Sequence, residues 1–151
     1  MATTDADPIF VDTNVLVYAS RPSAPEHAVA REALATIELS RRTAWISPQV
    51  LREYLAVVTR PQATAPPPPM ATAISDVRRF RSAFEIAEDG PAVFERLLVL
   101  LSTCPGAGKQ GHDANLAATM LVHGISRLLT FNAADFQRFA HEIEIEALVR
   151  S

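Results

Sequence analysis

Short apolar runs alternate along this chain with longer segments in which apolar residues recur every three or four positions. The runs with the length and composition of β-strands lie at 9–11, 44–47, 84–87 and 127–131. The longer segments have the periodicity of amphipathic helices, which we expect at about 25–42, 48–60, 70–82, 91–103 and 111–123. Strands that alternate with helices usually pair in parallel. The sequence therefore predicts an α/β sandwich.

Two segments outside this alternation have ordinary structural explanations. The run Pro66–Pro69 lies between two predicted helices and indicates a stiff polyproline spacer, although a ligand for a proline-binding partner is an alternative. Glutamate and isoleucine alternate over 142–146, which fits an edge strand with one solvated face. Acidic side chains at such an edge also discourage pairing with other chains.

The length of 151 residues is typical of one domain, so we expect a single domain that spans 1–151. No apolar run approaches the roughly 20 residues of a membrane helix, and the polar N-terminus lacks the features of a secretory signal. We therefore expect a cytoplasmic protein with no membrane partner. The net charge of −3 argues against broad nonspecific binding of nucleic acid, so any nucleic acid would be contacted locally.

The segment IFVDTNVLVYA places Asp12 directly after a strand that should be buried. At the carboxyl end of a parallel strand, a carboxylate stands where open α/β sheets bind their ligands. Aspartate also favours the position before a helix, so Asp12 could instead cap a helix that starts at Thr13 or Asn14. Taken alone, this residue leaves both explanations open.

Two helical segments also carry a carboxylate toward the side expected to face the core. Glu53 follows Val50 by three positions and precedes Val57 by four, so it lies on the apolar stripe or at its edge. Asp113 precedes Leu116 by three positions and shares its face. A surface arginine could pair with Glu53. The helix dipole would favour Asp113 in a first turn by under about 1 kcal/mol.

Polar residues also follow the late strand, in LLTFNAADF. Asn132 and Asp135 come just past the carboxyl end of this strand, and they would lie beside Asp12 if the first and last of the four predicted strands are neighbours. Asp135 could instead cap a turn around 136–139. Thr130 and Asn132 could equally be ordinary turn residues.

Together these acids come from two strand ends and two core-facing helix positions, which makes coincidence the weaker explanation. Carboxylates that pack closely raise one another's pKa unless a cation neutralises them. Oxygen ligands without a cysteine or histidine cluster favour Mg²⁺ or Mn²⁺ over Zn²⁺. The sequence therefore predicts a site for a hard divalent cation.

The same residues resemble the motifs of the PIN-domain nucleases, and in particular those of the VapC-type toxins of VapBC toxin–antitoxin pairs. The matching segments are FVDTNVLVYA, the glutamate of SPQVLREYLAV, HDANLAATMLVHG and RLLTFNAADF, in the order found in the family. The resemblance implies a three-layer α/β/α sandwich around a central, mainly parallel sheet of about five strands.

The resemblance also implies a function. It indicates a metal-dependent endoribonuclease toxin that hydrolyses phosphodiester bonds in RNA, such as tRNA or another translation RNA, and that a VapB-type antitoxin neutralises. A homodimer is expected. Carried over by position, the residues that would hold Mg²⁺ or Mn²⁺ and take part in catalysis are Asp12, Glu53, Asp113 and Asp135. Supporting polar or substrate contacts would come from Thr13, Asn14, Thr130, Asn132 and Lys109.

The motifs leave some points open. Many relatives carry an acid where this chain has Asn132, so the division of roles between Asn132 and Asp135 is undecided. The same asparagine also allows a PIN fold that has lost catalysis and serves as a binding module. A phosphoacceptor receiver, another α/β domain with an acidic pocket, would need paired acids after the first strand and a lysine after the last. This chain instead has Thr13 and Asn14, and lacks that lysine.

Overall fold

The computed structural model describes residues 7–63, 65–104, 108 and 110–150. One sheet has the strand order β3-β2-β1-β4-β5, and each neighbouring pair is parallel. Its strands are β1 (Ile9–Val11), β2 (Ala44–Ile46), β3 (Glu85–Ile86), β4 (Arg127–Thr130) and β5 (Glu144–Ala147). This sheet confirms the predicted α/β architecture. The first four strands lie within the apolar runs, and β5 overlaps the alternating segment 142–146.

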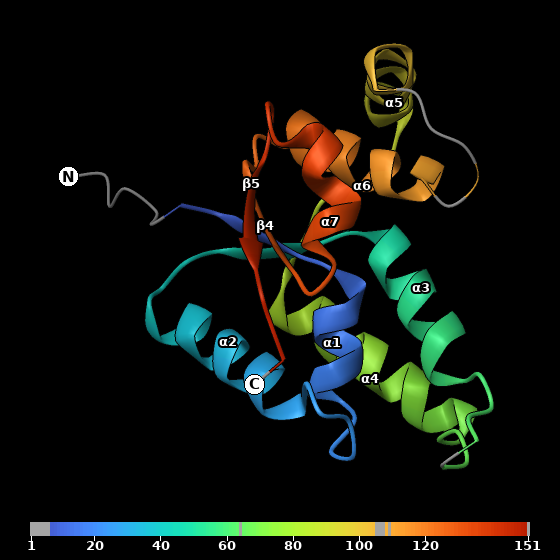
Figure 1. The fold of residues 1–151 in the computed structure, drawn as a ribbon. Helices are drawn as coiled ribbons and strands as arrows, with labels where there is room; N and C mark the ends of the chain where they lie inside the picture. The colour runs from blue at the N-terminus through green and yellow to red at the C-terminus, as the bar shows by residue number, and fades with distance from the viewer. Residues whose placement is uncertain (1–6, 64, 105–107, 109, 151) are drawn as a thin grey trace.

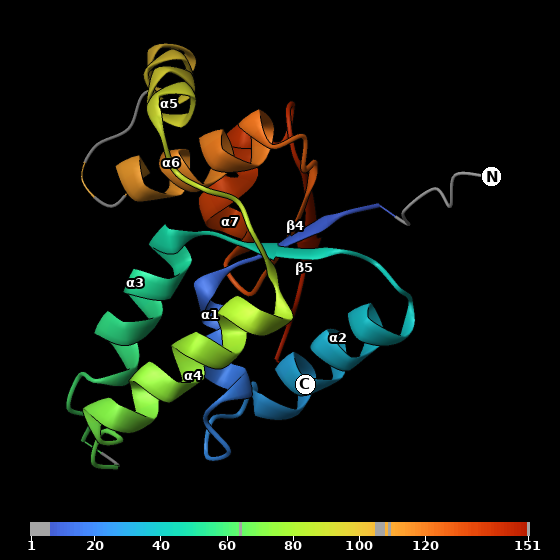
Figure 2. The same ribbon diagram turned by 180° about the vertical axis from the view of Figure 1, so that it is seen from behind.

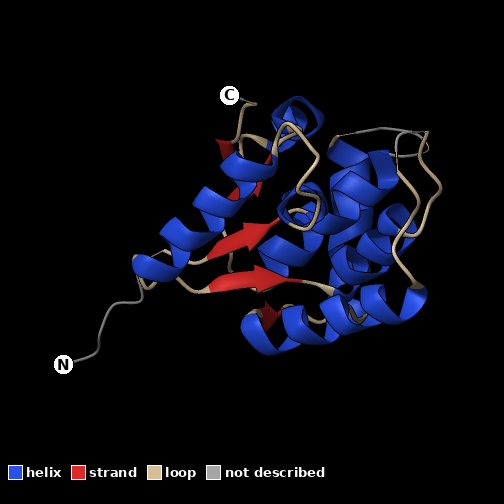
Figure 3. Ribbon diagram, turned by 90° about the horizontal axis from the view of Figure 1, so that it is seen from below, coloured by secondary structure: helices blue, strands red, loops and turns tan. Residues whose placement is uncertain are grey.

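Helices cover both faces of the sheet, as predicted. Figures 1 and 2 show α1 to α4 on one side of the strands and α5 to α7 on the other. Figure 3 shows from below how the helices pack along the strands. The helices are α1 (Thr13–Ala19), α2 (His27–Leu39), α3 (Pro48–Val58), α4 (Met70–Ala83), α5 (Pro91–Thr103), α6 (Gln110–Val122) and α7 (Ala133–Phe136), and the 3₁₀ turn η1 (Gln137–Phe139) follows α7.

Helices α1, α2 and α7 differ most from the sequence-based expectation, in which 133–136 was not assigned to a helix. The helix expected over 25–42 is shorter, because α2 ends at Leu39 and the chain turns at Arg41, whose φ of 58° is left-handed. Helix α1 is present in the structure but was not among the helices expected from the sequence. Its seven residues are nearly all apolar, so they carry too little periodicity to reveal a helix.

The sheet register explains why residues far apart in the sequence meet. Strand β1 is fully buried and pairs with β4 so that Val11 lies opposite Leu129. The backbone N–H of Asp12 then donates to the carbonyl of Leu129 at 3.0 Å, which brings Asp12 beside Thr130 at the carboxyl edge. Because the chain leaves β1 toward β2 on one side and β4 packs on the other, this point is the topological switch point of the sheet, where open α/β folds bind ligands.

Local sequence signals start and end the helices around this edge. Ser47 caps α3 by accepting a hydrogen bond from the N–H of Val50 at 3.3 Å, and Pro48 occupies the first helical position. Gly124, with a φ of 71°, follows the end of α6 and lets the chain turn back into β4. These signals fix where α3 begins after β2 and where α6 ends before β4.

Surface segments match their ordinary structural explanations. Pro66–Pro69 is exposed and connects α3 to α4. Strand β5 lies at one edge of the sheet, and Glu146 of this strand forms an ion pair with Arg42 at 2.9 Å. None of the described helices is both long and apolar enough to cross a membrane.

Candidate active site

Asp12 is held rigidly at the carboxyl edge of β1. Its side chain is buried, and the residue is 7% exposed. One carboxylate oxygen accepts from the N–H of Thr13 at 2.7 Å, and the other accepts from the Thr130 hydroxyl at 2.8 Å and the Asn14 amide at 3.2 Å. The strand end and these donors together fix the orientation of the carboxylate.

The two explanations for Asp12 coexist. Asp12 is the N-cap of α1, and its side chain accepts from the first helical N–H. Yet its second oxygen points to Thr130 of β4, which a cap does not require. Asp12 therefore both begins a helix and places a carboxylate at the switch point of the sheet.

Asn14 and Thr130 lock the end of β4 to the start of α1. The Asn14 side-chain oxygen accepts from the N–H of Phe131 at 3.1 Å, and its amide nitrogen lies 3.3 Å from the Thr130 hydroxyl. Thr130 is fully buried, and its hydroxyl also accepts from the N–H of Asn132 at 2.9 Å. Asn14 and Thr130 are thus brought into direct contact with Asp12, as expected if they orient it.

Thr13 connects Asp12 to a second acid, Glu53 of α3. Its backbone N–H donates to Asp12, while its hydroxyl donates to Glu53 at 2.9 Å. The other oxygen of Glu53 accepts from the Gln49 amide at 2.8 Å. Glu53 is half-buried, and donors from two different helices hold both of its oxygens.

Burial and nearby acids both affect the pKa of Asp12. Burial raises the pKa of Asp12 from its ordinary value of 3.8 to about 6, against the lowering effect of the hydrogen bonds from Thr130 and Thr13. The negative charges of Glu53 and Asp113 raise this pKa further. Asp113 lies in the first turn of α6 and is half-buried. Glu53 and Asp113 are therefore close enough for their charges to act on Asp12.

The remaining predicted residues lie at the periphery or outside the described residues. Asn132 is exposed at the N-cap position of α7, and Asp135 is exposed in the first turn of that helix. The N–H of Asp135 donates to the Asn132 carbonyl, so Asp135 stands inside α7 and does not cap the turn after it. Lys109 lies outside the described residues.

The sequence analysis missed two amide side chains next to the acids. Gln49 is 6% exposed and donates to Glu53, and Asn115 of α6 donates to Gln49 at 2.7 Å. Gln49 lies one helical turn before Glu53, and this spacing was the available signal. The spacing does not show that the amide also reaches α6.

The donor chemistry suits a hard divalent cation. Across the described residues, no three His, Cys, Asp or Glu side chains are gathered tightly enough to form a metal site unaided. Mg²⁺, however, is commonly bound by one or two carboxylates, with water and substrate phosphate as the other ligands. Asp12 and Glu53 share Thr13 as a donor, and the neighbouring acids disfavour the charge of Asp12, which a cation would relieve. These residues therefore fit Mg²⁺ or Mn²⁺.

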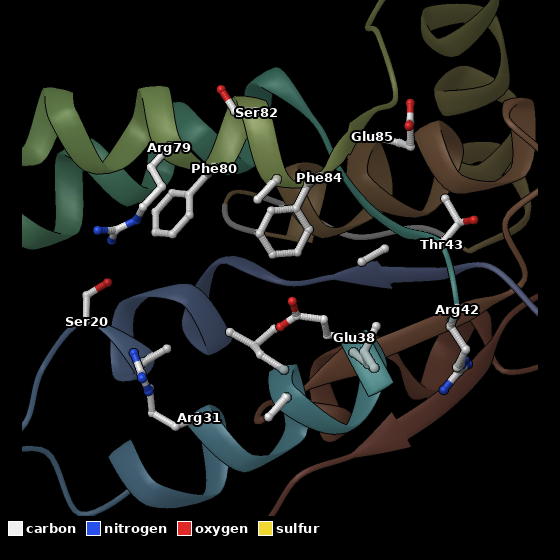
Figure 4. A pocket seen from close by; sticks show the side chains of 16 residues that line it. Ser20, Arg31, Glu38, Arg42, Thr43, Arg79, Phe80, Ser82, Phe84 and Glu85 are labelled. Atoms are coloured by element: carbon white, nitrogen blue, oxygen red, sulfur yellow. The ribbon is translucent and has the colours of Figure 1, made fainter. Parts of the chain in front are cut away.

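A large hollow among the described residues lies elsewhere. It has a volume of about 850 Å³ between α2 and α4, and Figure 4 shows Phe80 of α4 and Phe84, which follows that helix, pointing toward α2. Arg31 and Glu38 of α2 also line this hollow. Because its described lining contains none of the acids at the carboxyl edge, this hollow is separate from the candidate active site.

Comparison with known proteins gives consistent matches. The family model of the PIN domain matches residues 9–142. Ribonuclease VapC24 of Mycobacterium tuberculosis is 29% identical over 131 residues, which cover 85% of this chain and 89% of that protein.

Solved structures show the same arrangement of elements. VapC20 of Mycobacterium tuberculosis, described as a sarcin-ricin loop cleaving toxin, matches with a TM-score of 0.65 at 19% identity, over 95% of this chain and 99% of that chain. VapBC2 of Rickettsia felis, bound to a DNA fragment from its promoter, matches with a TM-score of 0.62 at 20% identity, over 93% and 98% of the two chains. At these identities the likeness concerns the fold.

Proposed function

Because this chain belongs to the PIN domain family, we propose that it is a metal-dependent endoribonuclease and the toxin of a type II toxin–antitoxin pair. One observation carries the catalytic part: Thr13 joins the carboxylates of Asp12 and Glu53, and the charge of Asp113 acts on Asp12 from α6. The names of the relatives, a ribonuclease VapC and a toxin that cleaves the sarcin-ricin loop, support RNA as the substrate.

The acids have distinct roles in this proposal. Asp12, Glu53 and Asp113 would hold Mg²⁺ or Mn²⁺, and Glu53 or Asp113 would position the attacking water. When bound, the cation supplies an activated water and neutralises charge at the phosphate under attack. Thr13 and Thr130 keep Asp12 in place through the hydrogen bonds described above, which matters because ligands must be held to within about half an ångström.

Substrate contacts come from residues around the acids. Asn14 and Asn132 stand at the same strand end as Asp12, where they can approach a phosphate. The net charge of −3 offers little general attraction to RNA, so a few basic side chains would supply the phosphate contacts. The sequence motifs suggest Lys109 as one of them. Asp135 would serve as a fourth acid, with Asn132 as a supporting polar residue at the same strand end.

The partners follow from the same proposal. We propose that the substrate is tRNA or another translation RNA and that the protein acts in the cytoplasm. We propose a VapB-type protein as the antitoxin, because solved VapBC complexes contain chains of this fold. We also place the chain in a homodimer and treat 1–151 as one PIN domain. A co-expressed antitoxin should relieve the growth arrest that the toxin causes.

Cleavage of total bacterial RNA by the purified protein tests the catalytic proposal. The protein should cleave RNA in the presence of Mn²⁺ or Mg²⁺, and cleavage should stop when EDTA is added. Asp12→Asn should abolish cleavage, because it removes one metal-binding charge at almost no cost in volume. Asp89→Asn is the matched control: this exposed residue keeps an oxygen to accept from the N–H of Gly90.

The outcome separates an enzyme from a binding module. If the folded protein cuts no RNA with either ion and calorimetry detects no binding of Mn²⁺, the catalytic proposal fails. A PIN fold that serves in binding would then be the better description.

A further inference from the structure

The side-chain amide of Gln49 spans two of the elements that carry the acids. Its nitrogen donates to Glu53 on α3 at 2.8 Å and to the carbonyl of His112 on α6 at 2.9 Å. Its oxygen accepts from the Asn115 side chain on α6 at 2.7 Å. Gln49 is 6% exposed, so these bonds form away from competing water.

Only an amide can make this set of bonds. The two acceptors, a carboxylate and a carbonyl, require an NH₂ group, while the donor on Asn115 requires an oxygen. The reversed amide would set its oxygen against both acceptors, so the orientation follows from the partners. A glutamate at position 49 would repel Glu53, and an apolar residue of similar size would make none of the three bonds.

The bonds link two helices that otherwise pack on different neighbours. In the described part of the chain, α3 packs mainly on α1 and α4, whereas α6 packs mainly on α5 and α7. The two α6 residues that Gln49 contacts, His112 and Asn115, lie on either side of Asp113 in the sequence. Gln49 is therefore a direct polar link between the helix of Glu53 and the helix turn that carries Asp113.

We propose that Gln49 is a positioning residue, which sets the separation of Glu53 and Asp113 by joining α3 to the first turn of α6. This role rests on the proposed function, because the separation matters only if both acids serve one cation and one phosphate. Gln49 acts through its neighbours and does not touch the reacting atoms. Asn115 completes the link by holding the amide oxygen.

The affinity for Mn²⁺, measured by calorimetry, tests this role independently of activity. Gln49→Met keeps the volume and removes all three bonds, and it should weaken Mn²⁺ binding by about 10- to 100-fold, as is typical for residues that support metal ligands. In RNA cleavage, kcat should fall while KM for RNA stays near the wild-type value. Gln137→Met is the matched control, because Gln137 is exposed on η1. It should leave Mn²⁺ affinity and kcat unchanged.

Amide hydrogen exchange tests the link without metal. In the metal-free protein, Gln49→Met should accelerate exchange over 112–116, and Gln137→Met should not. Asn115→Ala provides a second variant should Gln49→Met fail to fold, because Asn115 is half-buried and alanine favours a helix. It should weaken Mn²⁺ binding in the same direction and by a smaller factor.

The possible results separate this role from the proposed function. If the wild type binds Mn²⁺ and cuts RNA and both Gln49→Met and Asn115→Ala match it in Mn²⁺ affinity, the positioning role is wrong and the enzyme stands. If the wild type neither binds Mn²⁺ nor cuts RNA, the proposed function falls and the positioning role falls with it.

Discussion

Replacing Asp12 with asparagine should change how the stability of the metal-free protein depends on pH. The folded protein holds the pKa of Asp12 at about 6, whereas the unfolded chain has the ordinary value of 3.8. Between these values the folded state binds more protons than the unfolded state, so the free energy of unfolding falls as the pH rises. Above about pH 6 the full loss is present.

The magnitude follows from the two pKa values. The total loss is about 3 kcal/mol, at about 1.4 kcal/mol for each pH unit between the pKa values. Of this, about 2 kcal/mol should develop between pH 4.5 and pH 8. The Asp12→Asn side chain carries no charge and escapes this loss. It also sets a nitrogen against Thr130 and Asn14, which costs about 1 to 2 kcal/mol at every pH. The pH dependence, not the difference at one pH, is therefore the decisive quantity.

This pH dependence of the free energy of unfolding is measured by urea unfolding in EDTA from about pH 4.5 to pH 8, with circular dichroism as the signal. The stability of Asp12→Asn relative to the wild type should rise by about 2 kcal/mol over this range. Asp89→Asn should instead run parallel to the wild type. Parallel curves for Asp12→Asn and the wild type would refute the reasoning, because they would show that the Asp12 carboxylate is not destabilised by its surroundings.

Other perturbations probe the residues around Asp12 and the ion pair on the edge strand β5. Thr130→Val removes a hydrogen bond that lowers the pKa of Asp12, so calorimetric titrations at several pH values should show Mn²⁺ binding developing at higher pH than in the wild type. The loss of RNA cleavage rate caused by Asp135→Asn should be at least tenfold smaller than the loss caused by Asp12→Asn, because Asp135 is exposed. Equal losses would show that Asp135 contributes as much to catalysis as Asp12. The hydrogen bond from Arg42 lowers the pKa of Glu146 below its ordinary 4.5, so this pair stabilises the fold above about pH 4.5 and its contribution is lost as the pH falls further. Arg42→Met should therefore lose less stability than the wild type when urea unfolding is repeated below pH 4.5, and an unchanged acid dependence would contradict this assignment.

The sequence was informative wherever a local pattern determined the structure. The run at 9–11 is uniformly apolar because β1 is covered on both faces, and this burial is visible without coordinates. The acids Asp12, Glu53 and Asp113 stood out because a carboxylate on an apolar face is rare. The charges of these three acids do come together in the structure.

Features that depend on tertiary contacts could not be predicted in this way. The sequence places Gln49 one turn before Glu53, but only the packing of α3 beside α6 shows that its amide meets His112 and Asn115. The sequence also left open whether Asp12 caps a helix or belongs to the candidate site. Asp12 does both, because the strand ends where the helix begins. The exposure of Asp135 likewise depends on the position of α7, which the short motif does not specify.

The hydrogen bond between Thr130 and Asp12 joins residues 118 positions apart. It forms only when β4 pairs with β1, so during synthesis Asp12 lacks this bond until β4 has left the ribosome. Contacts of such long sequence separation are slow to form, because the loop between them must first be closed. A nascent chain that has not yet formed β4 therefore carries Asp12 without the hydrogen bond from Thr130 that orients its carboxylate. Pairing of β4 with β1 thus makes the geometry at Asp12 depend on formation of the sheet.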